Sequence, residues 1–392
     1  MTSGENPFDF DHRYQGPYYT EDHKAWRNTL RAFVNREIMP FVDEWDEAGG
    51  FPRELYKKAA KVGLLGFGYP EEYGGIPVTD TFFAVIAAEE MARCSSGGIN
   101  ASLLSHSIGL PPILAAGSDE IKQRIAPAVL SGEKIQALAI TEPSGGSDVS
   151  NIKTRAKDGG DHYIVNGSKT YITSGMRADY YTVAVRTGGA GTGGISLLLI
   201  ERDREGFDRS ELKKQGWWAS DTATLYFENV RVPKENLIGA ENQGFKAIMV
   251  NFNMERLWMA ASANALARVC LEDALAWARS RQTFGQRLAD HQVIRHKFAE
   301  MARQINSTQA YLEQCTFRVD QGESPVADLS LLKVQSSLTM EFCAREAMQI
   351  MGGAAYMRGS RVERIYREVR VMAIGGGSEE IMRDLAARQM GI

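Results

Sequence analysis

The stretch Ala139–Asp148, with the sequence AITEPSGGSD, gathers side chains that are well suited to holding a polar ligand. Its hydroxyl groups, glycines and carboxylates follow directly on the apolar run Ala137–Ile140. In a loop after a strand, backbone N–H groups and Ser or Thr hydroxyls can donate to an anionic or heteroaromatic ligand, and glycines let that ligand approach the main chain. The stretch therefore predicts a polar binding loop, although an ordinary surface turn has a similar composition.

As a whole string, this stretch resembles the first signature of the acyl-CoA dehydrogenase family. The resemblance implies that the loop holds the isoalloxazine edge and the pyrophosphate of FAD. Asn151 is a departure, because the family usually has a small residue at that position. The residues that the resemblance assigns to FAD in this segment are Leu138, Ile140, Thr141, Gly146 and Ser147.

A second stretch, Asn166–Gly175 with the sequence NGSKTYITSG, resembles the family's second flavin segment. There an aromatic side chain covers the flavin and a threonine hydroxyl bonds its N5 side, which implies these roles for Tyr171 and Thr173. The family usually has tryptophan at the first position, and tyrosine leaves the stacking role possible. Without the neighbouring motifs, an ordinary hairpin with an aromatic residue on its buried face explains the stretch equally well.

Further segments are similar to the parts of the family that reach the FAD of a neighbouring subunit. Arginine suits bidentate contacts with phosphate. Taken alone, Arg281 is also explained as a solvated or ion-paired side chain at a helix end, and Gly352 as a helix stop. A cofactor shared between subunits implies at least a dimer, and the family is commonly a tetramer, a dimer of dimers. The residues assigned to FAD here are Arg281, Thr283, Phe284, Gln292, Gln349, Gly352, Gly353, Ser378 and Glu380.

The position of the catalytic base also follows from the resemblance. In much of the family the base is the Glu of a Tyr-Glu-Gly-Thr run near the C-terminus, but this chain has Gly375–Ser378 there, with the sequence GGGS. A smaller branch, which includes the isovaleryl- and long-chain acyl-CoA dehydrogenases, carries the base within a Glu-Arg pair on a helix. Glu255 and Arg256 match that pair.

The neighbours of Glu255 favour this role. On a helix, Phe252, Trp258 and Met259 share its face at i−3, i+3 and i+4. Apolar surroundings raise the pKa of a carboxyl group, as a general base requires. The alternative is a helix glutamate paired with a surface lysine, which is the usual fate of a lone glutamate.

The resemblance implies FAD-dependent α,β-dehydrogenation of an acyl-CoA thioester to a trans-2-enoyl-CoA. The backbone N–H of Gly376 would bond the thioester carbonyl, because a glycine retains that donor. Electrons would pass to an electron-transfer flavoprotein. Two alternatives stay open. One is an acyl-CoA oxidase on the same fold, and the other is a catalytically silent family member that acts as a binding or assembly partner.

The resemblance at the glycine run, Gly375–Gly377, also has implications for which acyl chains the protein prefers. Straight-chain enzymes of the family usually have Tyr at the position of Gly375, whereas isovaleryl-type enzymes have Gly, which leaves room for a methyl branch. The resemblance therefore implies a preference for branched acyl chains, and a straight-chain enzyme of broad range is the competing view. The residues assigned to the substrate are Ser147, Asn253, Arg256, Gly375, Gly377, Ala101 and Leu104.

Composition excludes several other classes of function. A net charge of −4 with scattered Lys and Arg provides no nucleic-acid footprint. No apolar run reaches the ~20 residues that span a membrane, and the polar N-terminus resembles neither a secretory signal nor a transit peptide. Neither the four cysteines nor the six histidines have metal-like spacing, so we expect no metal site, reduced packing cysteines and a cytoplasmic protein.

Hydrophobic periodicity predicts an α+β protein of three domains. A helical pattern over residues 1–135 precedes a β segment over 136–242, and a helical bundle follows over 243–392. Helices, a β-barrel-like domain and a helical bundle are the order expected for the acyl-CoA dehydrogenase fold.

Two glycine-containing motifs lead to specific predictions about turns. Asn166-Gly167 lies between two strand-like runs, which predicts a two-residue β-hairpin. Gly189–Gly194, with the sequence GAGTGG, satisfies the dinucleotide fingerprint formally. That fingerprint needs a helix next, and the following run Ile195–Ile200 reads as a strand, so we predict a hairpin loop instead.

Overall fold

A computed structural model describes residues 16–392, which divide into two compact units. The central unit comprises Glu44–Pro77 and Gly98–Glu255. The terminal unit comprises residues 16–43 together with Val78–Gly97 and Arg256–Ile392. The predicted order of helices, sheet and helices is confirmed, and the residue boundaries of the three domains stay a prediction.

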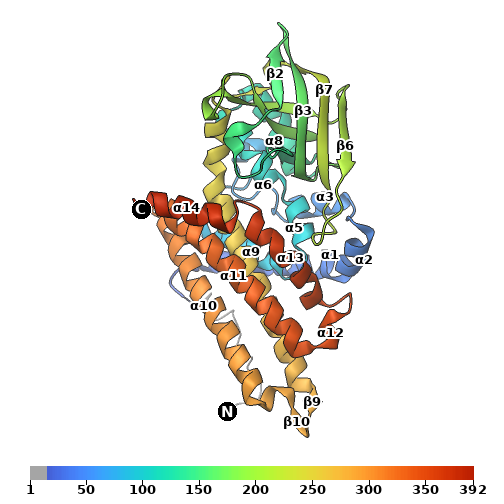
Figure 1. The fold of residues 1–392 in the computed structure, drawn as a ribbon, viewed down its shortest axis with the longest axis vertical. Coiled ribbons are helices and arrows are strands. Elements are labelled where there is room, and N and C mark those ends of the chain that lie inside the picture. The colour runs from blue at the N-terminus through green and yellow to red at the C-terminus, as the bar shows by residue number, and fades with distance from the viewer. Residues whose placement is uncertain (1–15) are drawn as a thin grey trace. The chain divides into compact units, whose positions relative to one another are not determined.

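Helices dominate the terminal unit. The long helices α10 and α11 pack side by side, and α13 and α14 pack on α11, as Figure 1 shows in orange and red. The helix α10 buries one stripe of side chains at three- and four-residue spacing, which includes Phe298, Met301, Ile305 and Leu312. The elements that lie wholly in this unit are α1 (Glu21–Glu37), α4 (Phe82–Ala92), β9 (Gln282–Thr283), β10 (Gln286–Arg287), α10 (Gln292–Asp320), α11 (Val326–Met351), α12 (Gly353–Tyr356), α13 (Arg361–Ile374) and α14 (Glu379–Gln389).

Three helices belong partly to each unit along the chain, namely α2 (Val42–Ala48), α5 (Gly97–Leu103) and the 37-residue α9 (Gly244–Ser280). Local sequence marks several helix ends. The Ser378 side chain accepts the N–H of Ile381 at the start of α14, and Gly352 ends α11 with a φ of +60°. None of the helices over residues 16–392 is both long and apolar enough to cross a membrane.

The central unit is built on one sheet with the strand order β6-β7-β3-β2-β4-β5-β8, and β1 adds to β4. The β1–β4 and β2–β4 pairings are parallel and the others are antiparallel. Its elements are α3 (Glu54–Lys61), α6 (His106–Gly109), α7 (Pro111–Ala116), α8 (Asp119–Leu130), β1 (Gln136–Ala139), β2 (Arg155–Asp158), β3 (His162–Thr173), β4 (Tyr180–Arg186), β5 (Ile195–Glu201), β6 (Phe207–Glu211), β7 (Thr222–Pro233) and β8 (Leu237–Ile238).

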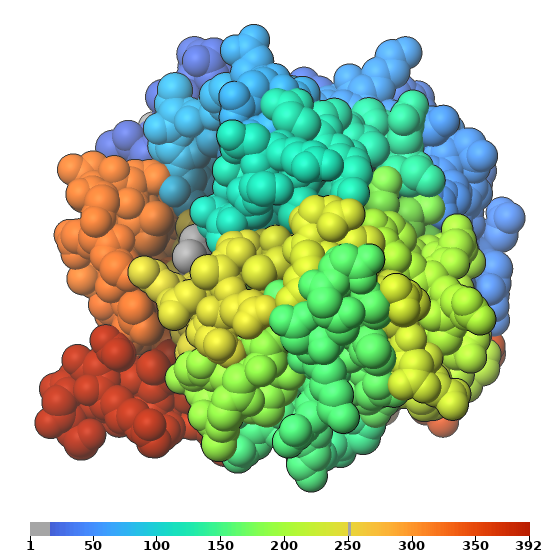
Figure 2. All heavy atoms as spheres, turned by 90° about the horizontal axis from the view of Figure 1, so that it is seen from above, coloured from blue at the N-terminus to red at the C-terminus, as the bar shows by residue number. Residues whose placement is uncertain are grey.

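The core of the central unit joins its helices to its sheet. One cluster of buried side chains includes Ile125 of α8, Leu197 of β5 and Ile248 of α9. Six consecutive residues of β5 are buried, so helices or loops cover both faces of this strand. Figure 2 looks onto the end of the sheet where β2 turns into β3, in green.

The predicted hairpin at Asn166-Gly167 is wrong. The strand β3 runs without a turn from His162 to Thr173, and both of its halves pair with β7. The register shifts between Val165 and Gly167 instead, because two residues of β7 face one residue of β3 there. An Asn-Gly pair supplies positive φ equally well to a turn and to a β-bulge, and long-range pairing decides between them.

A second register shift begins at Lys169, four residues after the first one begins at Val165, and it lies within the proposed flavin segment. Between Lys169 and Ile172, β3 carries the extra residue, and Tyr171 adopts a φ of +60°. At the first irregularity, Asn229 of β7 has a φ of +53°. Its backbone N–H donates to Asn166 Oδ1, and the side-chain amide of Asn166 donates to Asn229 Oδ1. The two bulges lie on opposite strands, so the strands return to a common register.

The prediction for Gly189–Gly194 is confirmed. The segment connects β4 to β5, which pair antiparallel, and the residues that follow it form β5 rather than a helix. All four cysteines are buried and free, which agrees with the packing role expected from the sequence.

Gly167 should tolerate no side chain. Its φ is +143°, and a Cβ atom there would stand 2.6 Å from Thr154 Cα. We expect Gly167→Ala to lower the melting temperature, with about 1–3 kcal/mol lost to backbone strain alone. Gly193→Ala is the control, because no atom lies within 4 Å of a Cβ placed there. Equal melting temperatures for both variants would contradict this account of the bulge.

Candidate functional site

The loop after β1 is held in a tight turn. The N–H of Gly145 donates to the carbonyl oxygen of Glu142 at 3.0 Å, and the N–H of Thr170 donates to that of Thr141 at 2.8 Å. Thr141 is half-buried, whereas Gly146 and Ser147 are exposed. The hydroxyls of Thr141 and Ser147 form no hydrogen bond with any residue over 16–392, so both remain available to a ligand.

The second flavin segment lies beside this loop, because the Thr170 bond joins β3 to it. Tyr171 follows directly, and its bulged backbone leaves 70% of its side chain exposed. Thr173 is half-buried at the end of β3. An aromatic ring presented at a strand bulge can cover a planar ligand, and this position agrees with the role implied for Tyr171.

The residues expected around the distal acyl chain are fixed to the same strands. Ala101 lies on α5 and is half-buried, and Leu104 follows that helix and is buried. The Ser105 hydroxyl donates to the carbonyl oxygen of Gln136 at 2.8 Å, at the start of β1. The Ser174 hydroxyl, directly after Thr173, donates to that of Ser105 at 3.2 Å.

The helix α9 carries the candidate base. Its early residues Ala247, Ile248 and Phe252 pack in the cluster that also contains Leu138 and Ile140 of the flavin loop. The side chains of Glu255 and Asn253 are half-buried. Arg256 is 5% exposed, so it is a buried arginine rather than a surface cation.

The glycine run lies between α13 and α14 in the terminal unit. A Cβ atom placed on Gly375 would stand 3.2 Å from the Val371 carbonyl oxygen and 4.0 Å from Met259 Cε. Gly376 has a φ of +65°, and its N–H donates to no residue over 16–392. The Lys333 ammonium donates to the carbonyl oxygen of Gly377 at 2.7 Å, which fixes the run from the far side.

Ser378 and Glu380 lie directly after the glycine run. Ser378 caps α14 through its side chain, so it already has a structural role. Glu380 is exposed in the first turn of the helix. Hydrogen bonds from its own backbone N–H and from the Ser378 side chain hold the pKa of its carboxyl group below the usual value.

Most residues expected to reach a neighbouring subunit are exposed at one end of the terminal helices, and Thr283 is half-buried. Thr283 belongs to β9 of the β9–β10 hairpin, and Arg281 directly precedes that strand. The turn of the hairpin is Phe284-Gly285, with φ of +50° and +80°. Phe284 is 99% exposed. Figure 1 shows this hairpin and α12 at the same end of the bundle. The remaining members, Gln292, Gln349, Gly352 and Gly353, are exposed as well.

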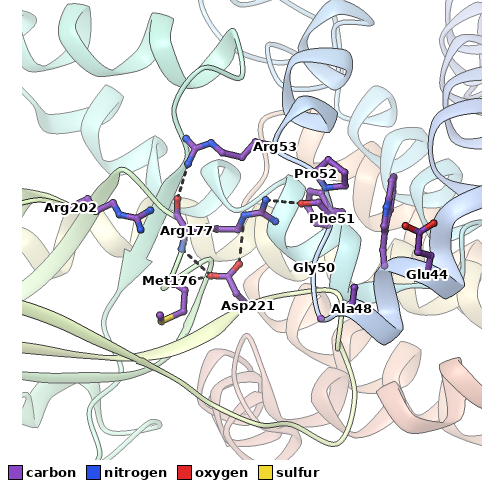
Figure 3. A pocket seen from close by; sticks show the side chains of 12 residues that line it. Glu44, Ala48, Gly50, Phe51, Pro52, Arg53, Met176, Arg177, Arg202 and Asp221 are labelled. Atoms are coloured by element: carbon purple, nitrogen blue, oxygen red, sulfur yellow. Dashed lines mark hydrogen bonds and ion pairs between the residues drawn. The ribbon is translucent and has the colours of Figure 1, made fainter.

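A hollow of about 590 Å³ in the central unit lies away from the flavin loop. Figure 3 shows it between Glu44, Phe51, Arg53, Arg177 and Arg202. None of the predicted site residues lines it. Over residues 16–392, no group of three or more His, Cys, Asp or Glu side chains is placed to hold a metal ion.

The sequence matches three family descriptions in chain order. They are "Acyl-CoA dehydrogenase, N-terminal domain" over residues 20–133, "middle domain" over 137–230 and "C-terminal domain" over 242–391. The chain belongs to the acyl-CoA dehydrogenase family. Members of this family are flavin-dependent oxidoreductases that use FAD.

Relatives in the family cover nearly the whole chain. "Acyl-CoA dehydrogenase AFT10-1" of Alternaria alternata is 41% identical over 95% of this chain and 92% of its own length. "Long-chain specific acyl-CoA dehydrogenase, mitochondrial" of Rattus norvegicus is 36% identical over 95% of this chain and 87% of its own length.

Solved structures of family members share the fold. A probable acyl-CoA dehydrogenase from Mycobacterium abscessus is 46% identical, with a TM-score of 0.93 over 95% of this chain and 100% of its own. A glutaryl-CoA dehydrogenase from Mycobacterium smegmatis, solved in complex with FADH2, is 26% identical, with a TM-score of 0.90 over 98% of this chain and 96% of its own.

The residues of the central unit fit the family's FAD. A flavin needs hydrogen-bond donors along its polar edge and an apolar or aromatic surface against its ring. The unpaired hydroxyls of Thr141 and Ser147 supply donors, and the exposed ring of Tyr171 supplies the surface. These side chains come from neighbouring segments, which the Thr170 bond holds together.

Removal of the two loop hydroxyls should weaken FAD binding. Each hydrogen bond to a charged or polarised group is worth ~1.5–3 kcal/mol. We therefore expect the double variant Thr141→Ala/Ser147→Ala to purify with less FAD than the wild type, as measured by flavin absorbance per protein. Ser144→Ala, an exposed hydroxyl of the same loop, is the control. Full FAD content and an unchanged visible spectrum in the double variant would show that the loop is misassigned.

Proposed function

We propose that this protein dehydrogenates acyl-CoA thioesters with Glu255 as the base that removes the α-proton. One observation carries the proposal. The helix α9 packs Phe252 in the same cluster as the flavin-loop residue Ile140, and Gly375 of the glycine run lies against Met259 of that helix. Glu255 lies on the same face of α9 as Phe252 and Met259, about one helical turn from each.

The glycine run supports this assignment. It carries no carboxylate where much of the family has its base, and it leaves the Gly376 N–H without an acceptor over residues 16–392. We propose that this N–H donates to the thioester carbonyl oxygen. Charge that develops on that oxygen during α-proton removal is then stabilised, which makes the α-hydrogen more acidic.

The reaction divides between cofactor and protein. Bound FAD supplies the acceptor for the β-hydrogen, which leaves as hydride. Glu255 accepts the α-proton, and the bonding electrons form the double bond of the trans-2-enoyl-CoA. The other groups position the substrate. We propose that Ser147 and Asn253 make polar contacts with the substrate and that the buried Arg256 also helps to position it.

Glu255→Gln should keep the protein folded and yellow while nearly abolishing flavin reduction by acyl-CoA. The change preserves shape but removes the proton acceptor, and general bases contribute typically ~10²–10⁴-fold. The measurement is anaerobic bleaching of the flavin in a stopped-flow instrument. Glu228→Gln makes the same chemical change at an exposed site on β7. Bleaching of the Glu255 variant at nearly the wild-type rate would remove Glu255 from the mechanism.

A companion variant tests whether the two base positions serve the same carbon atom. Glu255→Gly combined with Gly376→Glu should recover part of the lost activity. Recovery should be incomplete, because glutamate at a φ of +65° costs roughly 1–2 kcal/mol. No recovery from a folded, FAD-containing double variant would mean that position 376 does not face the α-carbon.

We also propose that the acyl cavity accepts a methyl branch. Gly375 presents no side chain beside Met259, and the half-buried Ala101 and buried Leu104 are small or apolar. Gly377 adds no side chain either. A single methyl contact changes discrimination by only ~1–3 kcal/mol, so the preference for branched chains should be graded. A broad straight-chain enzyme is the alternative, and a relative named for long chains supports it.

Gly375→Tyr should reverse the substrate order. We expect the wild type to have a higher kcat/KM for isovaleryl-CoA, or a longer 3-methyl analogue, than for the straight chain of equal backbone length. A tyrosine at Gly375 would fill the space beside Met259 and favour the straight chain. If octanoyl- or palmitoyl-CoA outpaces every branched substrate with the wild-type protein, the straight-chain alternative is correct.

The electron acceptor and the assembly complete the proposal. We propose an electron-transfer flavoprotein as acceptor, and oxygen consumption without an added acceptor would identify an oxidase instead. The exposed residues of the β9–β10 hairpin and of Gln349–Gly353 support an FAD shared between subunits of a homo-oligomer. Bleaching of the flavin by any acyl-CoA would exclude a catalytically silent protein. The cytoplasmic location stays a prediction of the sequence.

A further inference from the structure

Two buried charges lie directly behind the flavin loop. Glu142 is 4% exposed and Lys169 is fully buried, and their Oε1 and Nζ atoms are 2.8 Å apart. Burial of an ion pair costs solvation energy that the pair alone seldom repays, so such a pair needs additional hydrogen bonds. The contacts of these two side chains show what the pair holds in place.

Lys169 is hydrogen-bonded to the main chain at the start of the flavin loop. Its ammonium donates to the carbonyl oxygen of Ile140 at 2.9 Å, and the backbone N–H of the next residue, Thr170, donates to that of Thr141. Consecutive residues of β3 therefore hold consecutive carbonyl groups of the loop. Both bonds attach the chain beyond Ala139, the last residue of β1 and the last one that pairs with β4.

Glu142 closes the far end of the same segment. Its carboxylate accepts the backbone N–H groups of Lys153 at 2.6 Å and Thr154 at 2.9 Å. Residues 142–154 are thus tied at both ends by one side chain. Behind this closure, the buried Arg186 of β4 donates to the carbonyl oxygens of Ser150 and Ile152.

The pKa shifts of Glu142 and Lys169 favour the ionised form of both side chains at neutral pH. Burial lowers the pKa of Lys169 to about 8, although Glu142 opposes this effect, so the ammonium keeps its proton at pH 7. Burial would raise the pKa of Glu142, but Lys169 and the backbone donors outweigh it, and the pKa lies below the usual value. Both groups are therefore ionised when the protein works near neutral pH.

We propose that Glu142 and Lys169 are positioning residues for FAD, which act by holding the loop of Thr141 and Ser147 in its binding conformation. Neither side chain needs to touch the cofactor. A loop that is ordered before binding loses less conformational entropy when the ligand arrives, and this difference appears as affinity. The proposal rests on the assignment of FAD to this loop.

The test compares FAD binding with the stability of the apoprotein. We expect Lys169→Met to raise the Kd of FAD by about ten-fold to a hundred-fold, since one buried charge loses its partner. The flavin absorbance bands of the variant should also shift, because the donors along the ring edge are displaced. Lys157→Met, at an exposed lysine of the adjacent strand β2, should leave both quantities unchanged.

Glu142→Gln keeps the shape of the side chain, and it provides a second test if Lys169→Met does not fold. It should raise the Kd in the same direction. In Glu142→Gln/Lys169→Met neither charge is left buried alone, so the apoprotein should melt closer to the wild type than Lys169→Met does, while FAD binding stays weak. That separation of stability from affinity is the signature of positioning.

Two results would overturn the proposal in distinguishable ways. If the wild type binds FAD and the folded variants bind it equally well with unchanged spectra, then the pair is purely structural and the proposed function survives. If the wild-type apoprotein binds no FAD at all, then both the positioning role of Glu142 and Lys169 and the proposed function are wrong.

Discussion

The placement of Glu255 depends on the packing of the first turns of α9 against the core of the central unit. Phe252 and Ile248 lie in one cluster with Leu138 and Ile140, which lead into the flavin loop. Because a helix advances about 1.5 Å per residue with a fixed rotation, an anchor at Phe252 also fixes the height and direction of a side chain three residues later. A loop could not hold a carboxylate so reproducibly.

The same helix explains how the glycine run can serve without a carboxylate. With the proposed base on α9, position 376 would need to supply only its backbone N–H. A glycine suits this role, because it adopts a φ of +65° without strain and places no side chain beside the donor. Under the same proposal, the absence of a side chain at Gly375, beside Met259, would leave more room for the acyl chain.

Local patterns predicted the kinds of element well and their partners poorly. The strand after GAGTGG could be recognised because Ile195–Ile200 is a continuous apolar run. The continuity of β3 could not, because an Asn-Gly pair is compatible with a turn or a bulge, and pairing with β7, some sixty residues away, decides the outcome. The resemblance assigned roles to Tyr171 and Thr141, but it did not single out the ion pair behind them.

Glu142 and Lys169 show why such support residues escape sequence reasoning. Each is a common surface residue type, and only the fold reveals that both are buried. The one available signal was a lysine within the alternating pattern of β3, at a position where an apolar residue is expected. A charge in that position requires a partner, but the sequence alone does not identify Glu142 as that partner.

The central claim is that the Glu255 carboxylate removes the α-proton, and it can be measured apart from hydride transfer. An acyl-CoA analogue with sulfur in place of the β-carbon can exchange its α-hydrogens but cannot lose a β-hydride. In D₂O, we expect the wild-type protein with FAD bound to exchange deuterium into the α-position, as followed by mass spectrometry. Glu255→Asp should exchange slowly, because the carboxylate is retracted by one methylene, and Glu255→Gln should not exchange above the rate without protein. Undiminished exchange by a folded Glu255→Gln protein would contradict the account.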